Sequence, residues 1–168
     1  MKGTKKYSPK TIKKAIDTYK DPYLPKAGPH DMAVCKKCHA IYHNKRWSMD
    51  EALYQKKKEN KKAILILCPA CQKIRDRYAE GFVILKGDYL KGHKKDILNL
   101  IKNEEERAMG YNPLERIIEI KDRDNVVEIT TTHEKLAQRI GKKMHKACQG
   151  DLEIKMTQDR VTRVVWER

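Results

Sequence analysis

Two cysteine pairs constrain the fold of this chain more than any other feature. They are Cys35-Lys36-Lys37-Cys38 and Cys68-Pro69-Ala70-Cys71, with 29 residues between them. Two C-x-x-C turns are typical of a tetrahedral Zn²⁺ site, because each turn lets two thiolates reach one ion at about 2.3 Å while backbone N–H groups hydrogen-bond the sulfurs. A site with four sulfur ligands has no open coordination position, so its ion stabilises the fold and catalyses nothing. We therefore predict a structural Zn²⁺ cofactor on Cys35, Cys38, Cys68 and Cys71.

Three other roles of four cysteines compete with zinc. A pair of disulfides needs an oxidising compartment, and residues 1–7 are charged with no apolar stretch behind them to act as a secretory signal. A redox C-x-x-C pair normally follows the first strand of a βαβ unit, whereas here two copies are expected to face each other. An iron–sulfur cluster also takes four cysteines and stays open as an alternative. The fifth cysteine, Cys148, is interpreted as a small, partly buried apolar residue.

The charge of the chain is strongly positive and unevenly distributed. Its 168 residues carry a net charge of +15, and residues 1–62 hold 17 Lys and Arg against 6 Asp and Glu, a net +11. Such an excess attracts polyanions and favours binding by release of counterions, which indicates nucleic acid first and an anionic membrane second. The longest apolar run, residues 63–68, is far shorter than the roughly 20 residues that span a bilayer. We therefore expect a cytoplasmic protein with no membrane partner.

The order of the periodic segments predicts an α+β protein in four parts. These are a basic N-terminal arm (1–28), a zinc ribbon (29–90), a linking helix (91–112) and a ββαββ module of antiparallel type (113–168). The boundary near Pro113 implies that the last module folds by itself.

Local signals place the elements within these parts. In the arm, residues 11–19 are expected as a short helix and residues 21–25 as an ordered strap. In the ribbon, residues 63–67 and 81–85 are apolar enough for strands beside the cysteine turns. Capping-box patterns at Ser48 and Thr131 predict helices that begin near Met49 and just after Thr131. The strands of the last module are expected at residues 114–120, 126–130, 152–156 and 161–166.

Aromatic and cationic side chains follow the first cysteine turn. Basic residues interleaved with flat rings are typical of a nucleic-acid surface, because rings stack on bases while Lys and Arg neutralise phosphates. Trp47 is interpreted differently, as the cover of a small core beside the metal. The predicted contacts of this surface are Lys36, Lys37, Tyr42, Lys45 and Arg46, and a second surface on the last helix comprises Arg139, Lys142, Lys143 and Lys146.

Short motifs spread over nearly the whole chain carry a resemblance. They are Asp21-Pro22-Tyr23, Tyr42-His43, Arg46-Trp47, Leu67-Cys68-Pro69-Ala70-Cys71, Ile74-Arg75-Asp76, Asn103-Glu104, Pro113-Leu114, Thr130-Thr131, Ile140-Gly141, Gly150 and Val165-Trp166. With these motifs the chain resembles an uncharacterised bacterial family of small basic four-cysteine zinc-ribbon proteins. Members sometimes carry an ATPase label, which the absence of a phosphate-binding glycine loop does not support here.

A remoter resemblance links the same plan to the ribosome. Zinc turns followed by an α/β unit are similar to the zinc-binding front half of the archaeal and eukaryotic adaptor that escorts the large ribosomal subunit during export and maturation. The adaptor has more than one cysteine quartet, whereas this chain has one. The resemblance implies a ribosomal partner.

We therefore predict a zinc-stabilised RNA-binding protein, with RNA or a ribosomal subunit as its partner. A DNA-binding regulator and a protein-interaction adaptor are the alternatives. A hydrolase or nuclease would rely on Asp76, His43 and His133, but no second cluster of metal ligands accompanies them in the sequence. We accordingly expect no enzyme activity and no small-molecule substrate.

Overall fold

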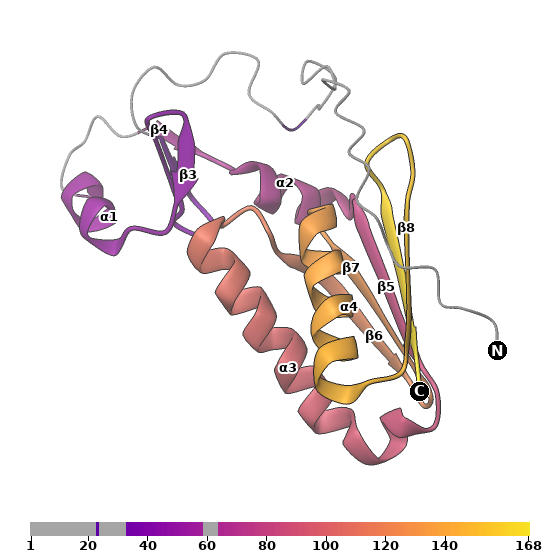
Figure 1. Cartoon of the computed structure of the whole chain (residues 1–168). Coiled ribbons are helices and arrows are strands. Elements are labelled where there is room, and N and C mark those ends of the chain that lie inside the picture. Colours follow the sequence, from indigo (N-terminus) through magenta and orange to yellow (C-terminus); the bar gives the residue numbers. More distant parts are fainter. Residues whose placement is uncertain (1–22, 24–32, 59–63) are drawn as a thin grey trace.

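The computed structural model describes Tyr23, residues 33–58 and residues 64–168, which together form an α+β fold (Figure 1). The predicted arm and its helix at residues 11–19 lie outside the described residues, apart from Tyr23. The Tyr23 ring lies 5.1 Å from the ring of Tyr78, just beyond the second helix. None of the helices in the described ranges is long and apolar enough to cross a membrane.

The first part of the fold, here called the metal module, contains a small sheet and two helices. The strands are β1 (Ala33–Cys35), β2 (Ile41–His43), β3 (Arg46–Ser48) and β4 (Ile64–Ile66), in the order β3-β2-β1-β4, and the helices are α1 (Glu51–Lys58) and α2 (Pro69–Asp76). β1 runs parallel to β4, with Cys35 opposite Ile66, and antiparallel to β2. Parallel strands end at the same edge of a sheet, so the segments that follow β1 and β4 start side by side.

The second part, here called the C-terminal unit, is a five-stranded sheet with two helices on one face (Figure 1). The strands are β5 (Gly81–Lys86), β6 (Ile117–Arg123), β7 (Val126–Thr131), β8 (Asp151–Met156) and β9 (Thr162–Glu167), in the order β6-β7-β5-β9-β8, and the helices are α3 (Tyr89–Tyr111) and α4 (Glu134–Cys148). Alternate residues of the central strands face the helices, which is why Val83, Leu85 and Trp166 are buried.

The strand expected at residues 81–85 belongs to this sheet and not beside the cysteine turns, where the sequence analysis placed it. β5 lies at the centre, antiparallel to β7 and parallel to β9. The hairpins β6–β7 and β8–β9 flank α4 along the chain, but in the sheet they do not pair with each other, because β5 lies between them. The sheet is therefore mixed rather than antiparallel, because the parallel pair β5 and β9 completes it.

α3 does more than link two modules. It spans 89–111, close to the predicted 91–112, but Ile97, Ile101 and Ala108 are fully or almost fully buried against the sheet and α4. α4 buries Leu136, Ile140 and Met144, as its amphipathic pattern predicted. The core of the second part thus begins at β5, some thirty residues before the predicted boundary near Pro113.

Both predicted capping boxes are wrong by two positions. Asp50, not Ser48, caps α1, since the Asp50 carboxylate accepts a 2.9 Å hydrogen bond from the Leu53 N–H. His133, not Thr131, caps α4, since its Nδ1 accepts from the Lys135 N–H at 3.2 Å. A cap must reach the N–H of the second or third helical residue, and only the residue next to the first turn does so.

Candidate metal centre and adjoining groove

The four predicted ligands lie together where β1 and β4 end. Cys35 ends β1, and Cys38 follows in the turn; Cys68 caps α2, and Cys71 lies in its first turn. Their Sγ atoms all lie within 4.8 Å of one another. The Sγ atoms of Cys38 and Cys68 are 3.6 Å apart, close to the roughly 3.8 Å between sulfurs in a tetrahedron with metal–sulfur bonds of about 2.3 Å. The arrangement thus fits one metal ion, and the cysteines are free thiols rather than disulfides.

Backbone N–H groups point at the sulfurs, as expected for C-x-x-C turns. The N–H of Cys68 donates to Cys35 Sγ, and the N–H of Cys71 donates to Cys68 Sγ, each at 3.4 Å. Pro69 begins α2 without an N–H of its own, at a helical position where that group would have had no partner in the helix. These donors favour the thiolate form that a metal requires.

The cluster cannot be fully ionised without a cation. Hydrogen bonds from Cys38, Cys68 and Cys71 hold the pKa of Cys35 far below its usual value. The hydrogen bonds that Cys68 makes to Cys35 and Cys38 raise its own pKa far above the usual value. Four adjacent thiolates repel one another, so protons stay on some of them until a cation replaces those protons. A divalent ion supplies that charge, and its binding releases protons.

A hollow of about 580 Å³, here called the inter-module groove, lies beside the cysteine cluster. The metal module contributes Tyr42, Lys45, Arg46, Trp47 and Pro69 to its lining, and the C-terminal unit contributes Tyr111, Asn112, Leu114, Glu115 and Lys135. Three of the predicted nucleic-acid contacts, Tyr42, Lys45 and Arg46, therefore share one concave surface.

The β2–β3 hairpin forms the first wall of the groove. Asn44 and Lys45 have φ values of 50° and 60°, as a two-residue hairpin turn requires, and this turn carries Lys45 and Arg46 at an exposed tip. Trp47 is only 7% exposed and packs against the cysteine cluster, which confirms its predicted structural role. The Trp47 ring lies 5.3 Å from the Tyr42 ring, so the wall also presents an aromatic surface.

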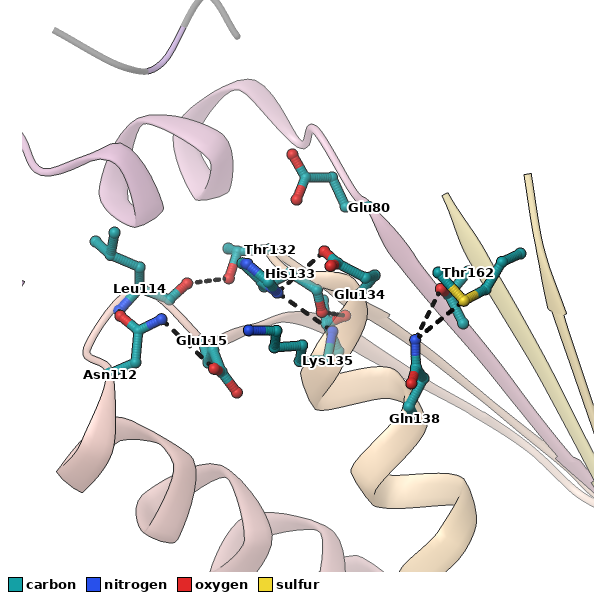
Figure 2. Close-up of polar contacts among 12 residues, drawn as sticks. Glu80, Asn112, Leu114, Glu115, Thr132, His133, Glu134, Lys135, Gln138 and Thr162 are labelled. Atoms are coloured by element: carbon teal, nitrogen blue, oxygen red, sulfur yellow. Dashed lines mark hydrogen bonds and ion pairs between the residues drawn. The ribbon is translucent and has the colours of Figure 1, made fainter. Parts of the chain in front are cut away.

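The ends of two helices form the second wall. Tyr111 is the last residue of α3 and is 73% exposed. Lys135 extends from the first turn of α4 toward Asn112 and Glu115 (Figure 2). Leu114 packs against the cysteine cluster, so the C-terminal unit touches the metal module directly. Neither Tyr111 nor Lys135 was predicted as a contact, because a ring or a cation at a predicted helix end is too common a signal in a sequence.

Glu115 brings one negative charge to the groove, and Arg139 offsets it. The Glu115 side chain is almost completely buried; its Oε1 accepts a weak, 3.4 Å hydrogen bond from the Asn112 amide, and its Oε2 forms a 3.1 Å ion pair with Arg139. Arg139, a predicted nucleic-acid contact, is thus already engaged. The other predicted contacts lie outside this groove: Lys36 and Lys37 are exposed in the first cysteine turn, Lys142 and Lys146 are exposed on α4, and Lys143 lines a separate hollow of about 340 Å³ with Arg107.

A second group of possible metal ligands includes His133. Glu80, His133 and Glu134 place ligand atoms within 4.8 Å of one another. In Figure 2, Glu80 and Glu115 lie on opposite sides of His133. The Lys73 ammonium, itself almost fully buried, forms an ion pair with Glu80 and donates to the Thr132 carbonyl at 3.4 Å. Lys73 already supplies positive charge here, so the group is best explained as a contact that joins α2 to the residues just before β5 and at the start of α4.

The residues proposed for a hydrolase do not come together. Asp76 pairs with Arg75 at 2.6 Å on α2, and His43 lies in β2. Neither joins His133 in a ligand group within the described part of the chain. Burial lowers the pKa of His133, which favours its neutral form.

No protein-family model matches this chain, and no curated protein or solved structure shows significant similarity to it. The family suggested by the sequence motifs stays a prediction. The function is therefore inferred from the metal centre and the inter-module groove themselves.

Proposed function

We propose that the protein is a zinc-stabilised RNA-binding protein. The observation that supports this most is the meeting of Tyr42, Lys45 and Arg46 with Tyr111 and Lys135 in one groove. RNA recognition uses this combination, because exposed rings stack on bases and cations neutralise phosphates. The net charge of +15 adds long-range attraction for a polyanion.

Zinc has a structural role in this proposal. Four cysteine ligands in a closed, mostly buried cluster favour Zn²⁺ and leave no coordination position for a substrate. The ion would fix the base of the β2–β3 hairpin, because Cys35 and Cys38 precede that hairpin directly. Metal analysis of the purified protein tests this: zinc at one ion per chain supports the assignment, whereas iron in a coloured sample supports the cluster alternative.

The first target to test is the large ribosomal subunit. Ribosomal RNA is the partner implied by the similarity of the zinc-turn plan to the export adaptor. We propose no catalytic role: among the described residues, the one group of possible metal ligands outside the four cysteines already has its charge compensated by Lys73.

Binding should be measured against single-stranded RNA, duplex RNA, duplex DNA and ribosomal subunits over a salt series. RNA affinity should fall steeply with salt as neutralised phosphates release counterions. Replacing Lys45 and Arg46 by Ala should weaken binding and flatten the salt slope, while Lys102→Ala, an exposed lysine of α3 outside the groove, should change the slope far less.

Two outcomes would replace the proposal. A preference for one duplex DNA sequence that survives competitor nucleic acid would favour a DNA-binding regulator. No salt-dependent binding to any of the four targets would favour a protein-interaction adaptor.

A further inference from the structure

Tyr111 presents an unoccupied aromatic face inside the inter-module groove. It is 73% exposed, the highest value among the exposed large hydrophobic side chains of the described residues. No ring or cation in the described ranges stacks on it, whereas the other wall holds the paired rings of Tyr42 and Trp47. A ring exposed to this degree packs little against its own chain, so its face is available to a stacking partner from outside the chain.

Cations come from both walls of the same groove. Lys45 and Arg46 project from the hairpin tip, and Lys135 extends from the opposite wall. No ion pair is found for any of the three among the residues that the structure describes, while the one acid in the lining, Glu115, is paired with Arg139. The groove therefore combines a net positive charge with rings on two sides.

The size and shape of the groove limit what can enter it. Its volume of about 580 Å³ lies within the roughly 300–1,000 Å³ of pockets that take small molecules. A base inside a double helix is stacked and paired and cannot reach rings in a hollow, whereas an unpaired base can be splayed out against them.

From these observations we infer that the inter-module groove holds one unpaired nucleotide of an RNA strand. Its base stacks on Tyr111, and its phosphates lie among Lys45, Arg46 and Lys135. The inference rests on the proposed RNA binding and adds the form of the RNA and two residues of the C-terminal unit. Because the two walls come from the metal module and the C-terminal unit, the nucleotide also bridges the two parts of the fold.

The test uses the full-length, metal-loaded protein and three fluorescein-labelled probes of equal length: a single-stranded RNA, an RNA duplex and an abasic oligomer. Tyr111→Ala should weaken binding of the single strand by about 5-fold to 150-fold, the loss found when one stacked base loses its aromatic partner. Tyr111→Ala should leave binding of the abasic oligomer unchanged, and Tyr111→Phe should retain wild-type affinity. Met156→Ala, which shortens a 60% exposed side chain of β8, serves as the control and should change nothing.

A lysine variant tests the predicted phosphate contacts separately from the stacking. Lys135→Ala should reduce the salt slope for the single strand by about 0.7, the value for one phosphate contact, while Lys102→Ala should leave it unchanged. Equal weakening of the single strand and the abasic oligomer by Tyr111→Ala would overturn the stacking role, as would no weakening at all. If Lys45→Ala and Arg46→Ala weaken RNA binding but Tyr111→Ala does not, the RNA-binding function stands and the groove is not the site of a base. If the unmodified protein binds no RNA, the proposed function itself fails.

Discussion

Removing the metal should unfold the metal module and leave the C-terminal unit folded. Each part has its own core and its own tryptophan, so the two parts can be followed separately. Trp47 packs with the cysteines in a buried cluster that otherwise contains only Ala40 and Ala70, whereas Trp166 is fully buried in the larger core under α3 and α4.

The free energy that the metal contributes is large compared with what the rest of the metal module can supply. A structural Zn²⁺ site contributes about 10–16 kcal/mol near pH 7, as much as the roughly 5–15 kcal/mol that keeps a whole domain folded. Without the ion, the described residues of the metal module bury only three larger apolar side chains, Val34, Ile41 and Trp47, and burying each contributes about 1.5–3 kcal/mol. Three such side chains fall short of the ion's contribution, so the module should not stay folded without it.

Labelling with 5-fluorotryptophan gives one ¹⁹F resonance for each core, and Trp47→Phe assigns them. On addition of chelator the Trp47 resonance should move to the shift of an unfolded chain while that of Trp166 stays in place, and added zinc should reverse the change. Movement of both resonances together would show that Leu114 and the Lys73–Glu80 ion pair join the two parts into one cooperative unit. Movement of neither would refute the structural role of the metal.

Three further predictions concern the C-terminal unit. Gly141→Ala should lower the free energy of unfolding by about 1–3 kcal/mol although alanine favours helices, because its Cβ would lie 2.4 Å from a side chain of β9. Gly110→Ala, whose Cβ meets nothing within 4 Å, should raise the free energy of unfolding by up to about 1 kcal/mol in the same urea titration. If Gly141→Ala were the more stable of the two variants, the packing argument would be wrong. A fragment of residues 79–168 should unfold cooperatively in chelator, whereas 112–168, which lacks the central strand, should give no cooperative transition by circular dichroism. Burial lowers the pKa of His133, so the unfolded chain binds the proton first and stability should fall as pH drops below about 6.5; the melting temperature of His133→Asn, which keeps a capping side chain, should depend less on pH, and an unchanged dependence would exclude His133 as its source.

Sequence reasoning succeeded where the partners are neighbours along the chain. The cysteine pairs, the hairpin of β6 and β7 and the inward face of α4 depend on spacings of two to four residues. β5 was recognised as a strand but assigned to the wrong sheet, because its partners β7 and β9 lie far along the chain and its own residues do not encode them. Apolar alternation shows that a strand is half buried, not which strand lies beside it.

The residues that line the groove also fall into those that the sequence predicted and those that it did not. Tyr42, Lys45 and Arg46 were predicted because they follow a cysteine turn closely in the sequence. Tyr111 and Lys135 reach the groove only because α3 and α4 pack side by side on the sheet, so that the end of one lies near the start of the other. No periodic pattern marks an exposed ring at a helix end, and a tertiary arrangement was needed to find it.

The position of β9 between β5 and β8 has a consequence for synthesis. The metal module is complete once residue 76 has been made, but the sheet lacks an interior strand until residue 167. At about 5–20 residues per second the interval lasts on the order of 5–18 s. During that time β5 has an open edge where β9 will pair, next to an incomplete apolar core, while the metal module already has all four of its ligands. When the bound metal is scarce, the metal module of a nascent chain would remain unfolded while its sheet still lacks β9. During that interval the chain is most exposed to proteases and chaperones.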